Sequence, residues 1–183
     1  MSLVLTPIDA VAGLAEAIEL RSERGLDTYD EWWEGVYRIV TGPSPEHGEL
    51  AVWLGAMLML AGRRVGLHVA APINIGVDKY DCRVPDLGVY APDTPRHSPA
   101  FLTTASLVVE LLSPGEPTGA KLDFYLANGV LEVLEVNVAT SVASLQARPV
   151  SGTAWSSLTA SVVVPGLEII DGVVVVDGER PPS

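Results

Sequence analysis

Apolar side chains recur at helical spacing in two stretches of the chain. The stretch 7–24 predicts a helix, because Leu14 and Ile18 repeat four residues apart behind a Thr-Pro start. The stretch 45–61 predicts a second helix with one apolar face. A shorter helix is predicted over 117–127, where an Asn-Gly pair favours its end.

Between these helices the apolar pattern changes to the alternation that is typical of β-strands. Strands are predicted within five segments: 29–40, 65–77, 82–90, 105–112 and 131–138. The first of these is a hairpin around an acidic, glycine-containing turn. The run 105–112 is apolar almost throughout, which is typical of a central strand covered on both faces. Further along, Asp171-Gly172 predicts the turn of another hairpin.

Interspersed helices and strands predict an α/β (α+β) fold, with a central mixed β-sheet flanked by helices. We expect one domain over 1–183, with a core over about 25–140. The segment 141–177 is expected to form a β-rich C-terminal extension, which is a candidate dimer interface.

The chain carries 23 acidic and 11 basic residues, which gives a formal net charge of −12. Nonspecific nucleic-acid binders gain most of their affinity from Lys and Arg, so this balance weighs against a broad nucleic-acid surface. It leaves room for a small cleft, whose binding of DNA is expected to be weak, metal-dependent or assisted by a partner. The single cysteine, Cys82, excludes an internal disulfide. We expect neither a signal peptide nor a membrane span.

Polar residues interrupt the apolar strands at two places. Glu110 lies within the most apolar run, where an unpaired carboxylate costs several kcal/mol, so this residue requires a partner. Asp86 opens the strand before it, and Lys121 follows just past a turn. Two carboxylates from adjacent strands, with an ammonium group nearby, suit a hard divalent cation such as Mg²⁺. Such a cation can activate a water molecule and neutralise charge on a phosphate.

The motifs around these residues resemble a known family. They are, in order, Pro85-Asp86, Glu110-x-Leu112-Ser113-Pro114, Lys121, Tyr125 and Gly129-Val130. This order resembles the Uma2 (DUF820) family of restriction-endonuclease-like proteins, within the PD-(D/E)XK nuclease superfamily. That family usually lacks the Lys two residues after the Glu, and this sequence has Leu112 there. The ammonium group comes instead from Lys121, on the next predicted helix.

The resemblance implies a restriction-endonuclease-like core and a metal-dependent endonuclease that hydrolyses DNA. It implies that Asp86, Glu110 and the backbone carbonyl of Leu111 bind Mg²⁺ or Mn²⁺. Lys121 would then position the attacking water and stabilise the developing charge. It also implies a bacterial, cytoplasmic protein, and a homodimer is expected.

Three accessory residues come from the same resemblance. The hairpin is similar to the family's Tyr-Glu-Leu-x-Asp-Gly-Glu segment, with Glu31 at the first Glu and Glu34 at the turn acid. Glu31 is a candidate to hold the metal or its waters; the alternative is a solvated turn with two surface acids. His47 matches a Pro-x-x-His signature at the start of the second helix, where it either contacts substrate phosphate or has a capping or packing role.

Two other classes of function stay open. A nuclease-like fold kept as a binding or dimerisation module, without turnover, fits the acidic net charge and the presence of Leu112. Retention of Asp86, Glu110 and Lys121 argues against it. A structural lattice or coat protein built from the β-rich tail is the third class, and a discrete soluble species would argue against that one.

Overall fold

A computed structural model gives the fold of residues 2–4, 13–78, 80–149 and 154–182, in which strands build two large sheets and one hairpin. The seven-stranded sheet has, in spatial order, β1 (Ser2–Val4), β3 (Val36–Val40), β2 (Glu31–Trp33), β6 (Asp81–Arg83), β5 (Asn74–Asp78), β9 (Phe101–Leu102) and β8 (Arg96–Ser98). The six-stranded sheet has β13 (Ser156–Leu158), β12 (Ala143–Ala147), β11 (Glu132–Asn137), β10 (Leu107–Leu112), β7 (Leu87–Tyr90) and β4 (His68–Ala70). The hairpin pairs β14 (Leu167–Ile170) with β15 (Val173–Val176).

The predicted α+β fold, with a mixed β-sheet flanked by helices, is confirmed, and the strands build a second large sheet besides it. The segment 65–77 divides into β4 and β5, and the segment 82–90 into β6 and β7. Pro72 and Pro85 fall at these two crossings. Because proline has no amide hydrogen to donate to a ladder, pairing stops there and the chain passes from one sheet to the other.

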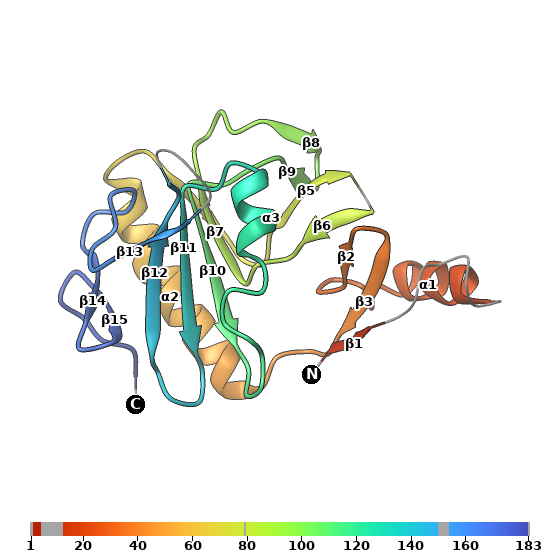
Figure 1. The fold of residues 1–183 in the computed structure, drawn as a ribbon, viewed down its shortest axis with the longest axis horizontal. Helices are drawn as coiled ribbons and strands as arrows, with labels where there is room; N and C mark the ends of the chain where they lie inside the picture. Colours follow the sequence, from red (N-terminus) through yellow and green to blue (C-terminus); the bar gives the residue numbers. More distant parts are fainter. Residues whose placement is uncertain (1, 5–12, 79, 150–153, 183) are drawn as a thin grey trace.

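Helices α2 (Pro45–Arg63) and α3 (Leu122–Ala127) cover opposite faces of the six-stranded sheet (Figure 1). Leu54 and Leu58 of α2 pack in one core cluster with Leu107 and Val109 of β10. On the other face, the side chains of α3 pack with Val108. The prediction that β10 is a central strand covered on both faces is thus confirmed.

The three predicted helices are present with changed ends. Helix α2 begins at Pro45 as predicted, with the Ser44 hydroxyl accepting the His47 amide at 3.3 Å. Helix α3 starts only at Leu122, whereas a start at residue 117 was expected. The reason is Gly119, whose φ of +76° lies in the left-handed region and is incompatible with a right-handed helix.

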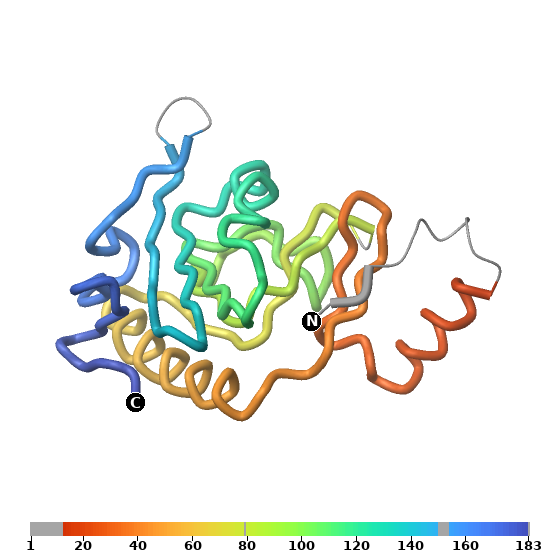
Figure 2. Tube along the Cα trace, turned by 60° about the horizontal axis from the view of Figure 1, so that its bottom comes forward, coloured from red at the N-terminus to blue at the C-terminus, as the bar shows by residue number. Residues whose placement is uncertain are grey.

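Helix α1 (Leu14–Glu23) is shorter than the predicted span, whose residues 7–12 lie outside the described part of the chain. It lies beside the hairpin β2–β3, at the end of the molecule opposite the C-terminal hairpin (Figure 2). Arg21 of α1 is 2.8 Å from Asp30, which precedes β2. The helix therefore borders the hairpin β2–β3 of the seven-stranded sheet and does not cover the six-stranded one.

The C-terminal extension is part of the core. Strands β12 and β13 complete one edge of the six-stranded sheet, and Leu167 and Val174 of the hairpin join the α2 cluster. The predicted Asp171-Gly172 turn is confirmed, since both residues have positive φ, as a type I′ hairpin turn requires. Within the described residues, every helix is too short or too polar to cross a bilayer.

Candidate active site

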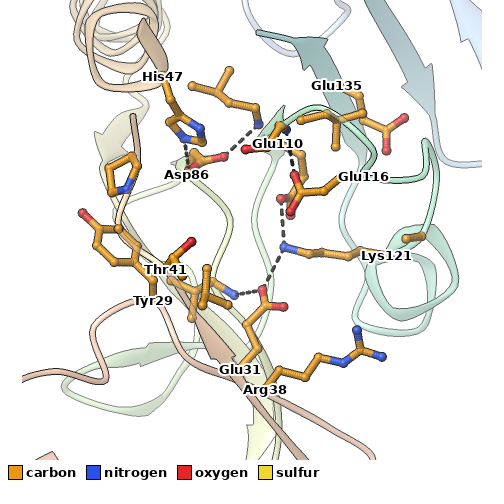
Figure 3. A pocket seen from close by; sticks show the side chains of 18 of the residues that line it. Tyr29, Glu31, Arg38, Thr41, His47, Asp86, Glu110, Glu116, Lys121 and Glu135 are labelled. Atoms are coloured by element: carbon orange, nitrogen blue, oxygen red, sulfur yellow. Dashed lines mark hydrogen bonds and ion pairs between the residues drawn. The ribbon is translucent and has the colours of Figure 1, made fainter. Parts of the chain in front are cut away.

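A cavity of about 530 Å³ opens where several parts of the chain meet (Figure 3). Its walls come from the hairpin β2–β3, the start of α2, the segment before β7, the end of β10, the loop that leads into α3, and β11. Asp86, Glu110, Leu111 and Lys121 all line it. The structure thus brings together residues that sequence analysis proposed from three separate segments.

Asp86 lies in the segment that connects the two sheets, one residue before β7. Its Oδ2 accepts the Leu111 amide at 2.8 Å, just beyond the last paired residues of β7 and β10. Its Oδ1 lies 2.8 Å from Nε2 of His47. Because an ionised carboxylate only accepts, Nε2 carries the hydrogen. Both oxygens of Asp86 are therefore fixed in direction by the protein.

Glu110 is 7% exposed and has both of the partners that its burial requires. Its Oε2 accepts from Nζ of Lys121 at 2.9 Å, and its Oε1 accepts a short hydrogen bond from the Tyr125 hydroxyl. Burial raises the pKa of Glu110 to about 7; the Lys121 charge opposes this rise, and the charges of Glu31 and Asp86 add to it. A carboxyl group with this pKa gains from any further positive charge in the cavity.

Glu31 supplies a second buried carboxylate, 4% exposed, from the opposite wall. Its Oε1 accepts from Nζ of Lys121 and from the Val84 amide, both at 2.8 Å. Its Oε2 accepts from Nε1 of Trp33 at 2.7 Å. Burial lowers the pKa of Lys121, but Glu110 and Glu31 outweigh burial and raise it overall. The ammonium group consequently stays charged between two carboxylates.

His47, at the start of α2, lines the cavity as well. The hydrogen bond to Asp86 raises the pKa of His47, and burial of the ring opposes that rise. A charged imidazole is therefore favoured beside Asp86. The cap of this helix is Ser44, whose hydroxyl accepts the His47 amide, so the His47 side chain does not serve as the cap.

Glu34 is the one proposed site residue that lies elsewhere. It is exposed at the turn between β2 and β3, with a φ of 50°, and is not among the residues that line the cavity. Its amide donates to Oδ1 of Asp81 at 3.3 Å. The reason is that Glu34 lies in the turn itself, beyond the end of the strand that carries Glu31 into the cavity.

Sequence analysis missed Glu135, a further buried acid of the cavity. Strands β10 and β11 are parallel, with Glu110 and Glu135 as direct neighbours. Oε1 of Glu135 accepts the Gly119 amide at 2.6 Å, and Oε2 has no hydrogen-bond partner among the described residues. Burial raises the pKa of Glu135, while the Gly119 amide, Lys121 and Ser144 oppose it. An acid in an apolar strand was the available signal, and it is the same signal that identified Glu110.

The donor groups of the cavity fit a hard divalent cation. Four carboxylates that line it are buried or half-buried, those of Glu31, Asp86, Glu110 and Glu135. They outnumber the cationic side chains of the cavity, and Oε2 of Glu135 is buried without a hydrogen-bond partner among the described residues. In the part of the chain that the structure describes, no three acidic, His or Cys side chains already converge as a metal site. Mg²⁺ requires only one or two carboxylates, since waters and substrate phosphates complete its shell. Asp86 and Glu110 meet that requirement.

Comparisons with known proteins show the family and the fold of the chain. The profile of the Uma2 family, described as "Putative restriction endonuclease", matches residues 17–175. A similar solved structure is that of a "putative nuclease belonging to DUF820" from Anabaena variabilis ATCC 29413, with a TM-score of 0.56 and 15% sequence identity. That similarity covers 72% of this chain and 78% of the other, and it confirms the expected fold. No curated protein matches the chain at a significant level.

Proposed function

Because this chain belongs to the Uma2 family of restriction-endonuclease-like proteins, we propose that it is a metal-dependent endonuclease that hydrolyses phosphodiester bonds in DNA. One observation carries the proposal: Asp86, Glu110 and Lys121 line a single cavity, with Nζ of Lys121 2.9 Å from Oε2 of Glu110. The family resemblance extends the proposal to a homodimer in the bacterial cytoplasm.

Asp86, Glu110 and the carbonyl of Leu111 would hold Mg²⁺ or Mn²⁺, which when bound supplies Lewis-acid activation of a water and neutralises phosphate charge. The surrounding hydrogen bonds orient these ligands. His47 and the Leu111 amide fix Asp86, and Tyr125 fixes Glu110. A carboxylate oxygen that accepts one hydrogen bond keeps a second lone pair, so these bonds are compatible with metal ligation.

Lys121 acts as a donor and a positive charge. Since Glu110 and Glu31 raise its pKa, the ammonium group does not accept a proton from water near neutral pH. It positions the attacking water through a hydrogen bond and stabilises negative charge that develops on the phosphate. Glu31 contributes by holding Nζ in place from the opposite wall, at 2.8 Å.

A second candidate is a nuclease fold used for binding or dimerisation without turnover. The observation that favours it is the double ion pair of Lys121, which compensates Glu110 without any metal. In that case the cavity is a structural polar network, and divalent cations have no preferred position in it.

Calorimetric titration of Mg²⁺ and Mn²⁺ separates the two candidates. Wild type is expected to bind with saturable heat, and Asp86→Asn and Glu110→Gln are expected to lose that heat. Asp123→Asn is the matched control, because Asp123 is an exposed carboxylate on α3. Absence of binding to wild type, or equal binding to all four proteins, would leave the binding module as the better account.

A further inference from the structure

Among the described residues that line the cavity, one guanidinium group, that of Arg38, forms no ion pair. Of its cationic side chains, Lys121 bridges two carboxylates and His47 contacts Asp86. Arg38 also lines the cavity, yet it forms no ion pair with any residue that the structure describes. Its charge is therefore available to a ligand.

Stacking holds this guanidinium group in place. Cζ of Arg38 lies 3.6 Å from the centroid of the Trp33 ring, and Cζ of Arg83 lies 4.4 Å from the same centroid. Nε1 of Trp33 donates to Glu31, which pairs with Arg38 across the β2–β3 ladder. Arg38 is thus positioned relative to Glu31, and through Glu31 to Lys121. A group fixed in this way loses little entropy when it binds.

The guanidinium group of Arg38, and not its surroundings, can attract an anionic ligand. Burial lowers the pKa of Arg38, Glu31 opposes this change and Arg83 adds to it. The guanidinium group nevertheless stays charged near neutral pH, because its unperturbed pKa is so high. Carboxylates dominate the rest of the wall, so the general field of the cavity repels anions. Recognition of a phosphate here requires a local, planar donor, which a guanidinium group provides.

We propose that Arg38 binds a phosphate of the nucleic-acid strand, next to the phosphate that is cleaved. The two positions are distinct because Arg38 and Glu31 lie at one end of the close view, and Asp86 and His47 at the other (Figure 3). This inference rests on the proposed function, since it assigns the strand contact of the same cavity. It makes Arg38 a substrate-binding residue in an otherwise acidic protein.

Salt-dependent binding tests the contact directly. The probe is a fluorescein-labelled DNA duplex of about 20 base pairs, measured by anisotropy between about 50 and 200 mM NaCl. Ca²⁺ replaces Mg²⁺ to slow cleavage, because it accepts oxygen ligands with looser geometry. Arg38→Gln is expected to weaken binding about tenfold and to reduce the slope of log K against log salt by about 0.9.

Two further variants keep this test decisive. Arg63→Gln makes the same charge change on an exposed residue at the far end of α2, and it is expected to keep the wild-type affinity and slope. Arg38→Lys keeps the charge and the apolar stem but not the planar fork, so the slope is retained while affinity falls several-fold. If thermal melting shows that Arg38→Gln is unfolded, Arg38→Lys alone decides, and full affinity in that variant overturns the inference.

Inorganic phosphate, added as a competitor, distinguishes a strand contact from a site for free phosphate. Competition only at millimolar concentration supports the strand, and competition at micromolar concentration overturns it. Cleavage is assayed separately on the same variants, with Mg²⁺ in place of Ca²⁺. If wild type cleaves DNA but Arg38→Gln keeps affinity and slope, the inference fails and the nuclease stands. If wild type binds DNA through Arg38 without cleaving it, the Arg38–phosphate contact is supported and the proposed nuclease activity is contradicted. If wild type does not bind DNA at all, both proposals are contradicted.

Discussion

The ammonium nitrogen of Lys121 lies 2.8 Å from Oε1 of Glu31, a residue 90 positions earlier in the chain. The same nitrogen lies 2.9 Å from Oε2 of Glu110 on the central strand β10. One cation therefore compensates two buried carboxylates and joins the hairpin β2–β3 to the six-stranded sheet. The charge of Lys121 explains how the buried carboxylates of Glu31 and Glu110 can lie close to the same point. Each of these contacts has a consequence that can be measured.

Loss of the Lys121 ammonium group should destabilise the fold. Lys121→Ala leaves Glu31 and Glu110 without their shared partner, and breaking a buried pair costs about 3–5 kcal/mol of unfolding free energy. Urea denaturation at neutral pH measures this change. Arg180→Ala is the control, because its 3.7 Å pair with Asp171 is exposed and is worth less than about 1 kcal/mol. Equal stability of the two variants would contradict the assignment.

The metal-free protein should lose stability as pH rises. The pKa of Glu110 is raised from 4.5 to about 7, so the folded protein holds this proton after the unfolded chain has released it. Its contribution to stability is complete below pH 4.5 and is lost as pH rises through about 7. The raised pKa of His47 acts in the same direction.

Thermal melting in EDTA, between about pH 5 and 8, measures this dependence. Glu110→Gln is expected to flatten the curve, and added Mg²⁺ to flatten that of wild type, since a bound cation favours the ionised carboxylate. A wild-type curve that is already flat, or a variant as steep as wild type, would show that Glu110 does not titrate in this range.

Removal of the Tyr125 hydroxyl should change the same pH profile. Tyr125→Phe deletes the donor to Oε1 of Glu110, at a cost of about 1.5–3 kcal/mol for a hydrogen bond to a charged group. Because this bond lowers the pKa of Glu110, its loss moves the midpoint of the melting profile to higher pH. Tyr90→Phe, whose ring lies outside the cavity, should leave the midpoint in place.

The core under the site should tolerate little loss of volume. Leu54 of α2 is fully buried against the six-stranded sheet, so Leu54→Ala is expected to cost about 2–5 kcal/mol in urea denaturation. Val52, on the same helix, is 74% exposed, and Val52→Ala should change stability by less than about 0.5 kcal/mol. Similar losses in both variants would mean that α2 does not pack through this face.

Local signals in the sequence predicted much of this fold. Ser44 and Pro45 define the start of α2, and Asp171-Gly172 defines the last hairpin, because each feature depends on residues that are adjacent in the chain. Glu110 was identified by the cost of burying its charge, a cost that the structure shows to be met by Lys121 and Tyr125. These features require no knowledge of distant contacts.

Features that depend on strand register could not be predicted. Glu135 lies beside Glu110 only because β10 and β11 pair in parallel with this alignment, which neither strand specifies alone. Arg38 enters the cavity because β3 pairs with β2 opposite Glu31. The division into two sheets likewise depends on pairing, because the strands before and after Pro85 pair with different partners. Long-range pairing decided all three.

Plasmid cleavage in the presence of Mg²⁺ or Mn²⁺, by wild type, Asp86→Asn and Asp123→Asn, tests the central claim most directly. The proposed function predicts that wild type and Asp123→Asn cleave at equal rates. It predicts that Asp86→Asn is slower by about a hundredfold or more, because loss of even an outer-shell partner of a metal costs up to about that factor. No cleavage by wild type with either metal, or equal cleavage by all three proteins, would contradict a nuclease site at Asp86.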